Sequence, residues 1–339
     1  MTKAQRQEAI RKIESQRSSR VIAYLTADRG VASTQMSEDV MRIAYDHLRA
    51  IGKVETIDLF LYSRGGDAML PWPFVNTIRA FCERFCVLVP FRAHSAATLT
   101  ALGADEIVMT PLAQLTPVEP TITMALNPED PQNRPRPLGI NVEDVATYMK
   151  FVKDRGKIES EEGRISALSS LTTHVNPVAL GHLHRFHLLA EQQAHKLLAL
   201  HMDPEHHEPE INDIVQKLIT TLWAHNYKIN RDEARALGLK AVDPNAADEA
   251  AIWALFEGYE TFMSLRKPLL AMASLFPAGQ AQVQINGNRM AVVESTERCD
   301  VFLVDLELHR PATPTPPGMP AQFSPQVQVT LTRQEWRKV

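Results

Sequence analysis

The sequence has few of the features that mark several large protein classes. Its 339 residues include only three cysteines, Cys82, Cys86 and Cys299, which are too few for a disulfide framework. Cys82 and Cys86 lie one helical turn apart, but no second pair completes a zinc site. The formal net charge is -4, so no strong basic field points to nucleic acid. We therefore expect a protein of a reducing cytoplasm that binds no nucleic acid.

Long apolar runs are also missing. No run reaches the ~18 uninterrupted apolar residues that a membrane span needs. The N-terminal stretch, residues 1–20, is charged and lacks the apolar core of a signal peptide. Since 45% of the residues are hydrophobic, the chain can nevertheless bury a sizeable core. We expect a soluble, globular protein with no membrane span.

Short apolar runs alternate with helical patterns over the first third of the chain. Such alternation with short links predicts an α/β fold, a parallel β-sheet covered by helices. The expected strands are 21–25, 57–62, 86–90 and 106–109, and the expected helices are 37–51, 71–85 and 96–102. A proline-rich loop at 127–139 comes next, and mostly helices follow it, at 142–152, 177–201, 211–225, 231–237 and 247–274.

The C-terminal part of the sequence changes character. Asn286-Gly287 lies between the apolar runs 283–285 and 290–293, which is a strong hairpin signal. Further strands are expected at 301–304 and 327–332, with a proline-rich loop between them. The predicted divisions are an N-terminal helix (1–19), a main domain (20–245), a long amphipathic helix (246–275) and a small β-rich extension (276–339).

A single serine, ringed by alanines, lies at a strand-to-helix junction. Ser95 follows the expected strand 86–90 and directly precedes the expected helix 96–102. Helix capping is the plain interpretation, because a serine before a helix commonly accepts hydrogen bonds from its first amides. The alternative is a nucleophile whose oxygen lies at the positive end of the helix.

A glycine pair ends the preceding strand. Gly65 and Gly66 can turn the backbone sharply and present free N–H groups, although a simple turn would also use them. They form neither a P-loop nor a dinucleotide fingerprint, because no Gly-Lys-Ser and no third glycine follow. Carboxyl ends of parallel strands meet at one sheet edge, so Ser95 should lie beside this turn. The N–H groups of the pair and of Ala96 would then form an oxyanion hole.

These segments resemble the ClpP/crotonase-type serine peptidases. LYSRGGDA, followed about thirty residues later by VPFRAHSAATLTALGADEIVMTPLAQLTPVEP, is similar to their SppA-like branch and most closely to the serine dehydrogenase proteinase (SDH-type) family. The stretch from His225 to Val242 is similar to a further element of that family. The resemblance spans roughly residues 20–243. It implies a ClpP/crotonase-like fold, a peptide or unfolded-protein substrate, no cofactor and a homo-oligomer.

Two departures from the family pattern lie beside the expected site. Alanines follow Ser95 where the family often has glycine, and Thr116 to Pro120 replaces a Gly-Pro-Val-Asp-Pro stretch. Glu119 in that stretch and His94 are candidates for shaping the pocket. A catalytically silent scaffold therefore remains an alternative. So does a crotonase-type acyl-thioester enzyme, although the sequence shows no sign of an adenine-nucleotide pocket.

The general base is left open by the sequence. ClpP carries a histidine about 25 residues after its serine, and this chain has none there. SppA-like relatives use a lysine, which can serve as a base if burial lowers its pKa towards neutrality. Lys150, Lys153 and Lys157 lie about 55 to 62 residues after Ser95, and Lys153 is the preferred candidate. His225 competes, because the pKa range of histidine suits a general base.

Two further features bear on metal binding and assembly. Several histidines between residues 182 and 201 lack an HExxH spacing or a carboxylate partner, so we expect no metal. The helix expected at 247–274 is apolar over a wide arc, which favours burial against a second copy of the chain. The alternative is a helix sandwiched within one chain. A partner ATPase is not identifiable from the sequence.

Overall fold

The computed structural model describes most of the chain, as two compact units. One unit comprises Met1–Leu115 and Ile229–Val339, and the other comprises Thr116–Lys228. The description covers residues 1–29, 32–118, 121–122, 125–128, 137–221, 227–266, 281–309 and 328–339.

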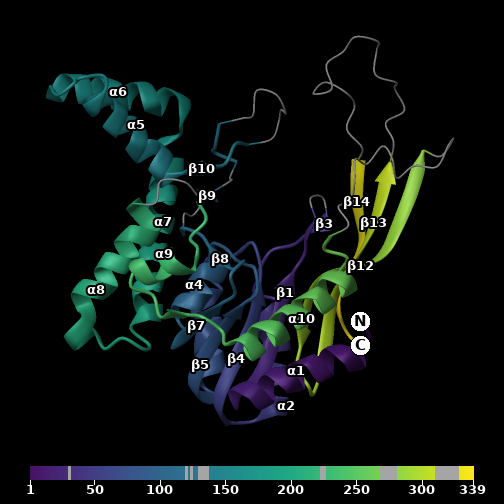
Figure 1. The fold of residues 1–339 in the computed structure, drawn as a ribbon. Helices are drawn as coiled ribbons and strands as arrows, with labels where there is room; N and C mark the ends of the chain where they lie inside the picture. The colour runs from purple at the N-terminus through teal and green to yellow at the C-terminus, as the bar shows by residue number, and fades with distance from the viewer. Residues whose placement is uncertain are drawn as a thin grey trace. The chain divides into compact units, whose positions relative to one another are not determined.

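An eight-stranded sheet forms the centre of the first unit (Figure 1). Its parallel part runs in the order β11 (Ala241–Val242), β7 (Glu106–Met109), β5 (Cys82–Val89), β4 (Val54–Tyr62) and β1 (Arg20–Thr26). The antiparallel strands β12 (Gln282–Glu294), β13 (Cys299–His309) and β14 (Gln328–Lys338) follow β1 in the same sheet. The α/β fold with a parallel core and C-terminal β-strands is confirmed. These strands extend the central sheet and do not form a separate layer.

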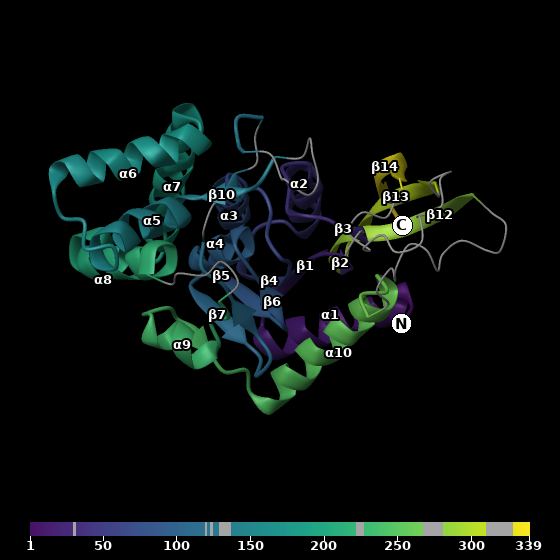
Figure 2. The ribbon, with the colours of Figure 1, turned by 90° about the horizontal axis from the view of Figure 1, so that it is seen from above.

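Helices cover both faces of the parallel strands, which explains why these strands are apolar almost without interruption. The last six residues of both β1 and β4 are buried. Figure 2 shows α1 (Lys3–Arg17) and α10 (Ala246–Phe262) on one face of the sheet, with α2 (Val40–Ile51), α3 (Pro71–Arg79) and α4 (Ala96–Leu102) on the other.

The wide apolar arc of α10 is covered within the single chain. Leu255, Phe256 and Tyr259 are buried in one cluster with residues of α1 and of the central sheet. The helix is therefore sandwiched inside its own unit, as the alternative interpretation held. It gives no independent reason to expect an oligomer, and residues 267–274 of the predicted helix lie outside the described part of the chain.

The predicted hairpin at Asn286-Gly287 is wrong. β12 runs through these residues as one strand and contains a bulge between Ile285 and Asn288. The bulge is stabilised by side chains, because Gly287 N–H donates to Asp305 Oδ1 at 2.6 Å and the Asn288 amide donates to two main-chain carbonyls. The actual turn lies at residues 295–298, where β12 leads into β13.

The predicted helix at 71–85 is too long. α3 ends at Arg79, and Cys82 already pairs with Val54 of β4. The apolar residues between Cys82 and Phe85 continue the helical pattern of the sequence. In the structure this segment belongs to β5 and its backbone pairs with β4. Pairing with a distant strand thus overrode the local periodicity.

The second unit is mostly helical. Its α6 (Glu161–His174), which contains no buried residue, was not predicted from the sequence. A weak apolar pattern gave no signal for this helix, whereas Ser160 accepts a capping hydrogen bond from Gly163 N–H and marks its start. The other helical elements are α5 (Val142–Asp154), α7 (Pro177–Leu198), α8 (Pro204–Gln216) and a π-helical turn, η1 (Lys217–Thr221).

None of the helices in the described ranges combines the length and the apolar character that crossing a bilayer requires. The three cysteines are unpaired. Burial raises the pKa of the Cys86 and Cys299 thiols to about 12, so both stay protonated at neutral pH.

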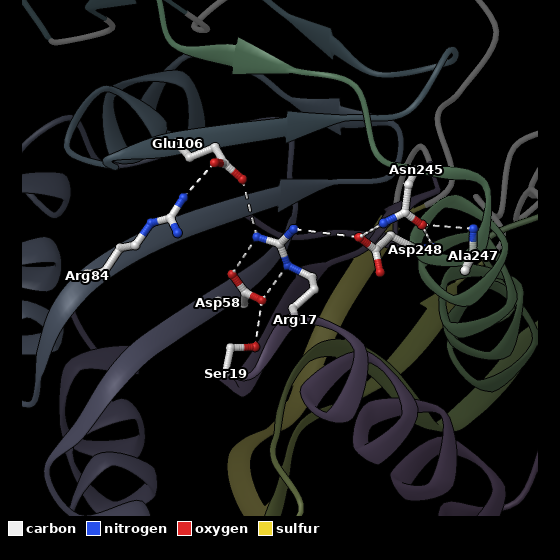
Figure 3. Close-up of polar contacts among 8 residues, drawn as sticks. All are labelled: Arg17, Ser19, Asp58, Arg84, Glu106, Asn245, Ala247 and Asp248. Carbon is white, nitrogen blue, oxygen red and sulfur yellow. Dashed lines mark hydrogen bonds and ion pairs between the residues drawn. The ribbon is translucent and has the colours of Figure 1, made fainter.

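Arg17, at the C-terminal end of α1, joins several segments that are distant in sequence (Figure 3). Its guanidinium binds Asp58 of β4 through two hydrogen bonds, of 2.7 and 3.1 Å. The same guanidinium lies 3.4 Å from Glu106 of β7 and 3.9 Å from Asp248 of α10. Ser19 also donates to Asp58 at 2.7 Å. The network fixes α1 and α10 to the amino ends of the parallel strands.

Replacing Arg17 with methionine should lower the free energy of unfolding by about 3 kcal/mol, because the Asp58 carboxylate, which is fully buried, would lose its cation. Urea denaturation measures the change. The matched control is Arg11→Met in the same helix, because Arg11 is 53% exposed and its pair with Glu8 should contribute less than about 1 kcal/mol. Equal effects of the two substitutions would contradict this role of Arg17.

Candidate active site

Ser95 has a backbone conformation unlike that of a helix cap. It precedes α4 with φ 53° and ψ -114°, and its side chain makes no capping hydrogen bond. The capping residues Ser160, Asn230 and Asn245 instead have negative φ and extended ψ, and their side chains accept from the first amides of their helices. The geometry therefore does not support the capping interpretation of Ser95.

The positive φ of Ser95 is strained. A non-glycine residue in such a conformation costs about 1–3 kcal/mol, and these residues cluster at functional sites. The strain arises at a sharp junction, where β6 (Arg92–Ala93) leads into α4 within two residues. Every residue of α4 is buried, whereas Ser95 is partly exposed. Such a strand–turn–helix junction presents a side chain outward, as a nucleophile requires.

The glycine turn lies directly against Ser95. Ser63 N–H donates to Arg92 O at 2.9 Å and His94 N–H donates to Ser63 O at 3.0 Å, so the continuation of β4 runs beside β6. A Cβ atom placed on Gly65, which has φ 95°, would lie 2.8 Å from Ser95 Cβ. The two sequence motifs therefore meet, and they can do so because residue 65 has no side chain.

The two glycines use their N–H groups differently. Gly65 N–H donates to Ser63 Oγ at 3.0 Å and is thus engaged within the protein. Met36 binds Gly65 O and Asp67 N–H, so the N–H and C=O groups of Gly66 point away from Met36. Over the described residues, no protein acceptor is bonded to the N–H of Gly66 or to that of Ala96.

A side chain at Gly66 would affect more than the site. A Cβ atom there would lie 2.3 Å from Met36 O and 2.5 Å from Met36 N. Since main-chain atoms cannot move aside locally, a substitution at Gly66 should destabilise the fold as well as block the site. Gly66 is therefore a poor position at which to separate the two effects.

The candidate bases and pocket residues fall in different parts of the chain. Lys150, Lys153 and Lys157 belong to the second unit, where all three are exposed and Lys150 pairs with Asp154 at 3.4 Å. His225 and Glu119 lie outside the described residues. His94 is buried beside Ser95 and contributes main-chain bonds to the junction.

Thr26 and Ser63 are buried hydroxyl residues that sequence reasoning missed. Thr26 Oγ1 and Ser63 Oγ are 2.7 Å apart, and both residues are fully buried. Thr26 ends β1 and Ser63 follows the end of β4. The sequence did contain a signal for this pair, because each of the two neighbouring strands is closed by a hydroxyl residue, Thr26 at the end of β1 and Ser63 directly after β4.

A serine–histidine–aspartate arrangement lies away from this edge. His47 Nδ1 is 2.8 Å from Ser295 Oγ, and His47 Nε2 is 3.1 Å from Asp300 Oδ2. Burial lowers the pKa of His47 to about 4, so the ring is neutral at neutral pH and Nε2–H donates to the carboxylate. The three residues are at most 2% exposed, so no substrate reaches them. The arrangement joins α2 to the turn between β12 and β13.

Comparison with known proteins adds distant relatives. Two uncharacterized proteins of Methanocaldococcus jannaschii are 24% and 22% identical to this chain. The alignments cover 74% and 68% of this chain and 77% and 69% of the relatives.

Two solved structures show a weak likeness to this chain. A membrane-bound stomatin-specific protease aligns with a TM-score of 0.35 at 13% identity, over 68% of this chain and 81% of its own. A protein assigned as an enoyl-CoA hydratase from Streptomyces coelicolor aligns with a TM-score of 0.32 at 12% identity, over 75% and 78% of the two chains. Scores this low carry no information about the site.

One family model matches the part of the chain that contains the site. The model of the ClpP-like SDH-type serine proteinases covers residues 1–129, which include Gly65, Gly66 and Ser95. The resemblance expected from the sequence is thereby confirmed over residues 1–129, which match the ClpP-like SDH-type serine proteinase family.

Proposed function

We propose that this chain is an SppA-like serine peptidase whose nucleophile is Ser95. Its oxygen would attack the scissile carbonyl, and the N–H groups of Gly66 and Ala96 would bind the oxyanion of the tetrahedral intermediate. The observation that supports this most is the strained backbone of Ser95 beside two N–H groups with no protein acceptor among the described residues.

The base in this proposal is Lys153 or His225. Serine is a weak nucleophile unless a neighbouring group takes its proton, and the same group then protonates the leaving amine. Lys153 is exposed and would need to lose its contact with water in the working enzyme before it could serve as the base. The pKa range of histidine suits a base without such a change of environment.

The substrate in this proposal is a peptide or an unfolded protein segment. The hydrolysis needs no cofactor, because the serine, the base and the two N–H groups supply the nucleophile, the proton transfer and the oxyanion binding. We propose a homo-oligomer in the cytoplasm, on the family resemblance and on the unpaired cysteines.

Substitution of the candidate bases tests this proposal. We expect Lys153→Met to lower kcat for hydrolysis of unfolded casein at least about 100-fold, whereas Lys150→Met and Lys157→Met should stay within about threefold. These two lysines are matched controls, because both are exposed residues of the same segment. A loss confined to His225→Gln would identify the histidine as the base. Wild-type protein that cleaves acyl thioesters but no peptide would overturn the peptidase proposal.

A further inference from the structure

A chain of buried hydroxyl groups supports the glycine turn from below. Ser63 Oγ accepts the N–H of Gly65, two residues further along the chain, at 3.0 Å. The same oxygen lies 2.7 Å from Thr26 Oγ1 on the neighbouring strand. Both hydroxyl side chains are fully buried, so water does not compete for these bonds.

The opposite side of the turn is held by main-chain bonds. Met36 N–H donates to Gly65 O, and Asp67 N–H donates to Met36 O, both at 2.8 Å. The hydroxyl chain thus engages the N–H of Gly65, and Met36 engages the C=O of Gly65 and the N–H of Asp67. Of the N–H groups of Gly65, Gly66 and Asp67, that of Gly66 alone has no protein acceptor among the described residues.

Glycine alone does not fix this arrangement. Two consecutive glycines have access to many backbone conformations, and several of them would turn a different N–H towards Ser95. The hydrogen bond from Gly65 N–H to Ser63 Oγ excludes the backbone conformations in which Gly65 N–H faces the site. Thr26 in turn orients the hydroxyl of Ser63, because one of the two hydroxyl groups donates a hydrogen bond to the oxygen of the other.

We propose that Thr26 and Ser63 are positioning residues that select Gly66 N–H as the oxyanion donor. The inference rests on the proposed function of Ser95 and adds to it a pair of residues that touch neither substrate nor nucleophile. Loss of either hydroxyl should slow the reaction of Ser95, because an oxyanion donor displaced by about 1 Å can cost up to 100-fold in rate.

The test compares rates of covalent labelling of Ser95 by a fluorophosphonate, which needs no knowledge of the natural substrate. We expect Ser63→Ala and Thr26→Val to be labelled about 10- to 100-fold more slowly than wild type. Thr26→Ser keeps the hydroxyl and should stay within about threefold. The matched control is Thr110→Val, because Thr110 is also buried and donates to Pro90 O at 2.7 Å, outside the glycine turn.

Thermal melting separates positioning from a purely structural role. Thr26→Ser loses a buried methyl group and Thr26→Val loses a buried hydrogen bond, so both variants should melt at a lower temperature than wild type. Positioning predicts that only the valine variant is labelled slowly. Slow labelling of both variants in proportion to their loss of melting temperature, or wild-type labelling in Ser63→Ala and Thr26→Val, would overturn the inference and leave the proposed function intact. Wild-type protein that is not labelled at Ser95 would overturn both.

Discussion

Replacement of Ser95 by alanine should lower peptide hydrolysis at least about 1000-fold, because the nucleophilic oxygen is removed and only binding and the oxyanion donors remain. The fold should stay intact, because the substitution removes one oxygen from a site of small residues and breaks no capping bond to α4. Steady-state hydrolysis of a peptide substrate and thermal denaturation measure the two effects.

A second substitution at the same position tests the strain. Ser95→Gly should be as inactive as Ser95→Ala, but more stable by about 1 kcal/mol, because glycine adopts φ 53° without a Cβ clash. An alanine variant that retains hydrolysis would exclude Ser95 as the nucleophile. A glycine variant less stable than the alanine variant would show that the backbone at residue 95 is not strained.

Replacement of Gly65 by alanine should lower activity by at least about 100-fold, because a Cβ atom would lie 2.6 Å from His94 O and 2.8 Å from Ser95 Cβ. The His94–Ser95 junction that carries the nucleophile would have to move, because the glycine turn already lies directly against its main chain. The stability should also fall, by a few kcal/mol. The rate of hydrolysis and the urea midpoint are the measurements.

Gly52→Ala is the matched control for this change. Gly52 has φ 79°, but a Cβ atom there would meet nothing within 4 Å. It should therefore lose about 1–3 kcal/mol of stability through backbone strain, and no activity. If Gly65→Ala behaves like Gly52→Ala, the close approach of Gly65 to Ser95 is not required for catalysis.

Much of the first unit could be predicted from the sequence, because its parallel strands are apolar and buried on both faces. α4 and β7 begin and end at the predicted residues. The C-terminal strands were harder to predict. Asn286-Gly287 has the composition of a tight turn, but pairing with β13 absorbs both residues in a bulge. Only the register between distant strands decides between these outcomes.

The proximity of Ser95 and the glycine turn followed from one rule of topology, that the carboxyl ends of parallel strands share an edge. The distinct parts played by the two glycines did not follow from it. They depend on which N–H Ser63 accepts and which carbonyl Met36 binds, and these contacts are set by strand register. The base was not predictable, because spacing along the chain does not place residues of the mostly helical second unit.

Locating a fluorophosphonate adduct by mass spectrometry is the most direct test of Ser95 as the nucleophile. The folded full-length chain is treated with the probe, digested and sequenced, with heat-unfolded protein and Ser95→Ala as controls. We expect one adduct, on Ser95, that is absent from both controls, because only the folded site activates the hydroxyl and binds the oxyanion. Folded protein without an adduct, or with its adduct on another serine such as Ser295, would contradict Ser95 as the nucleophile.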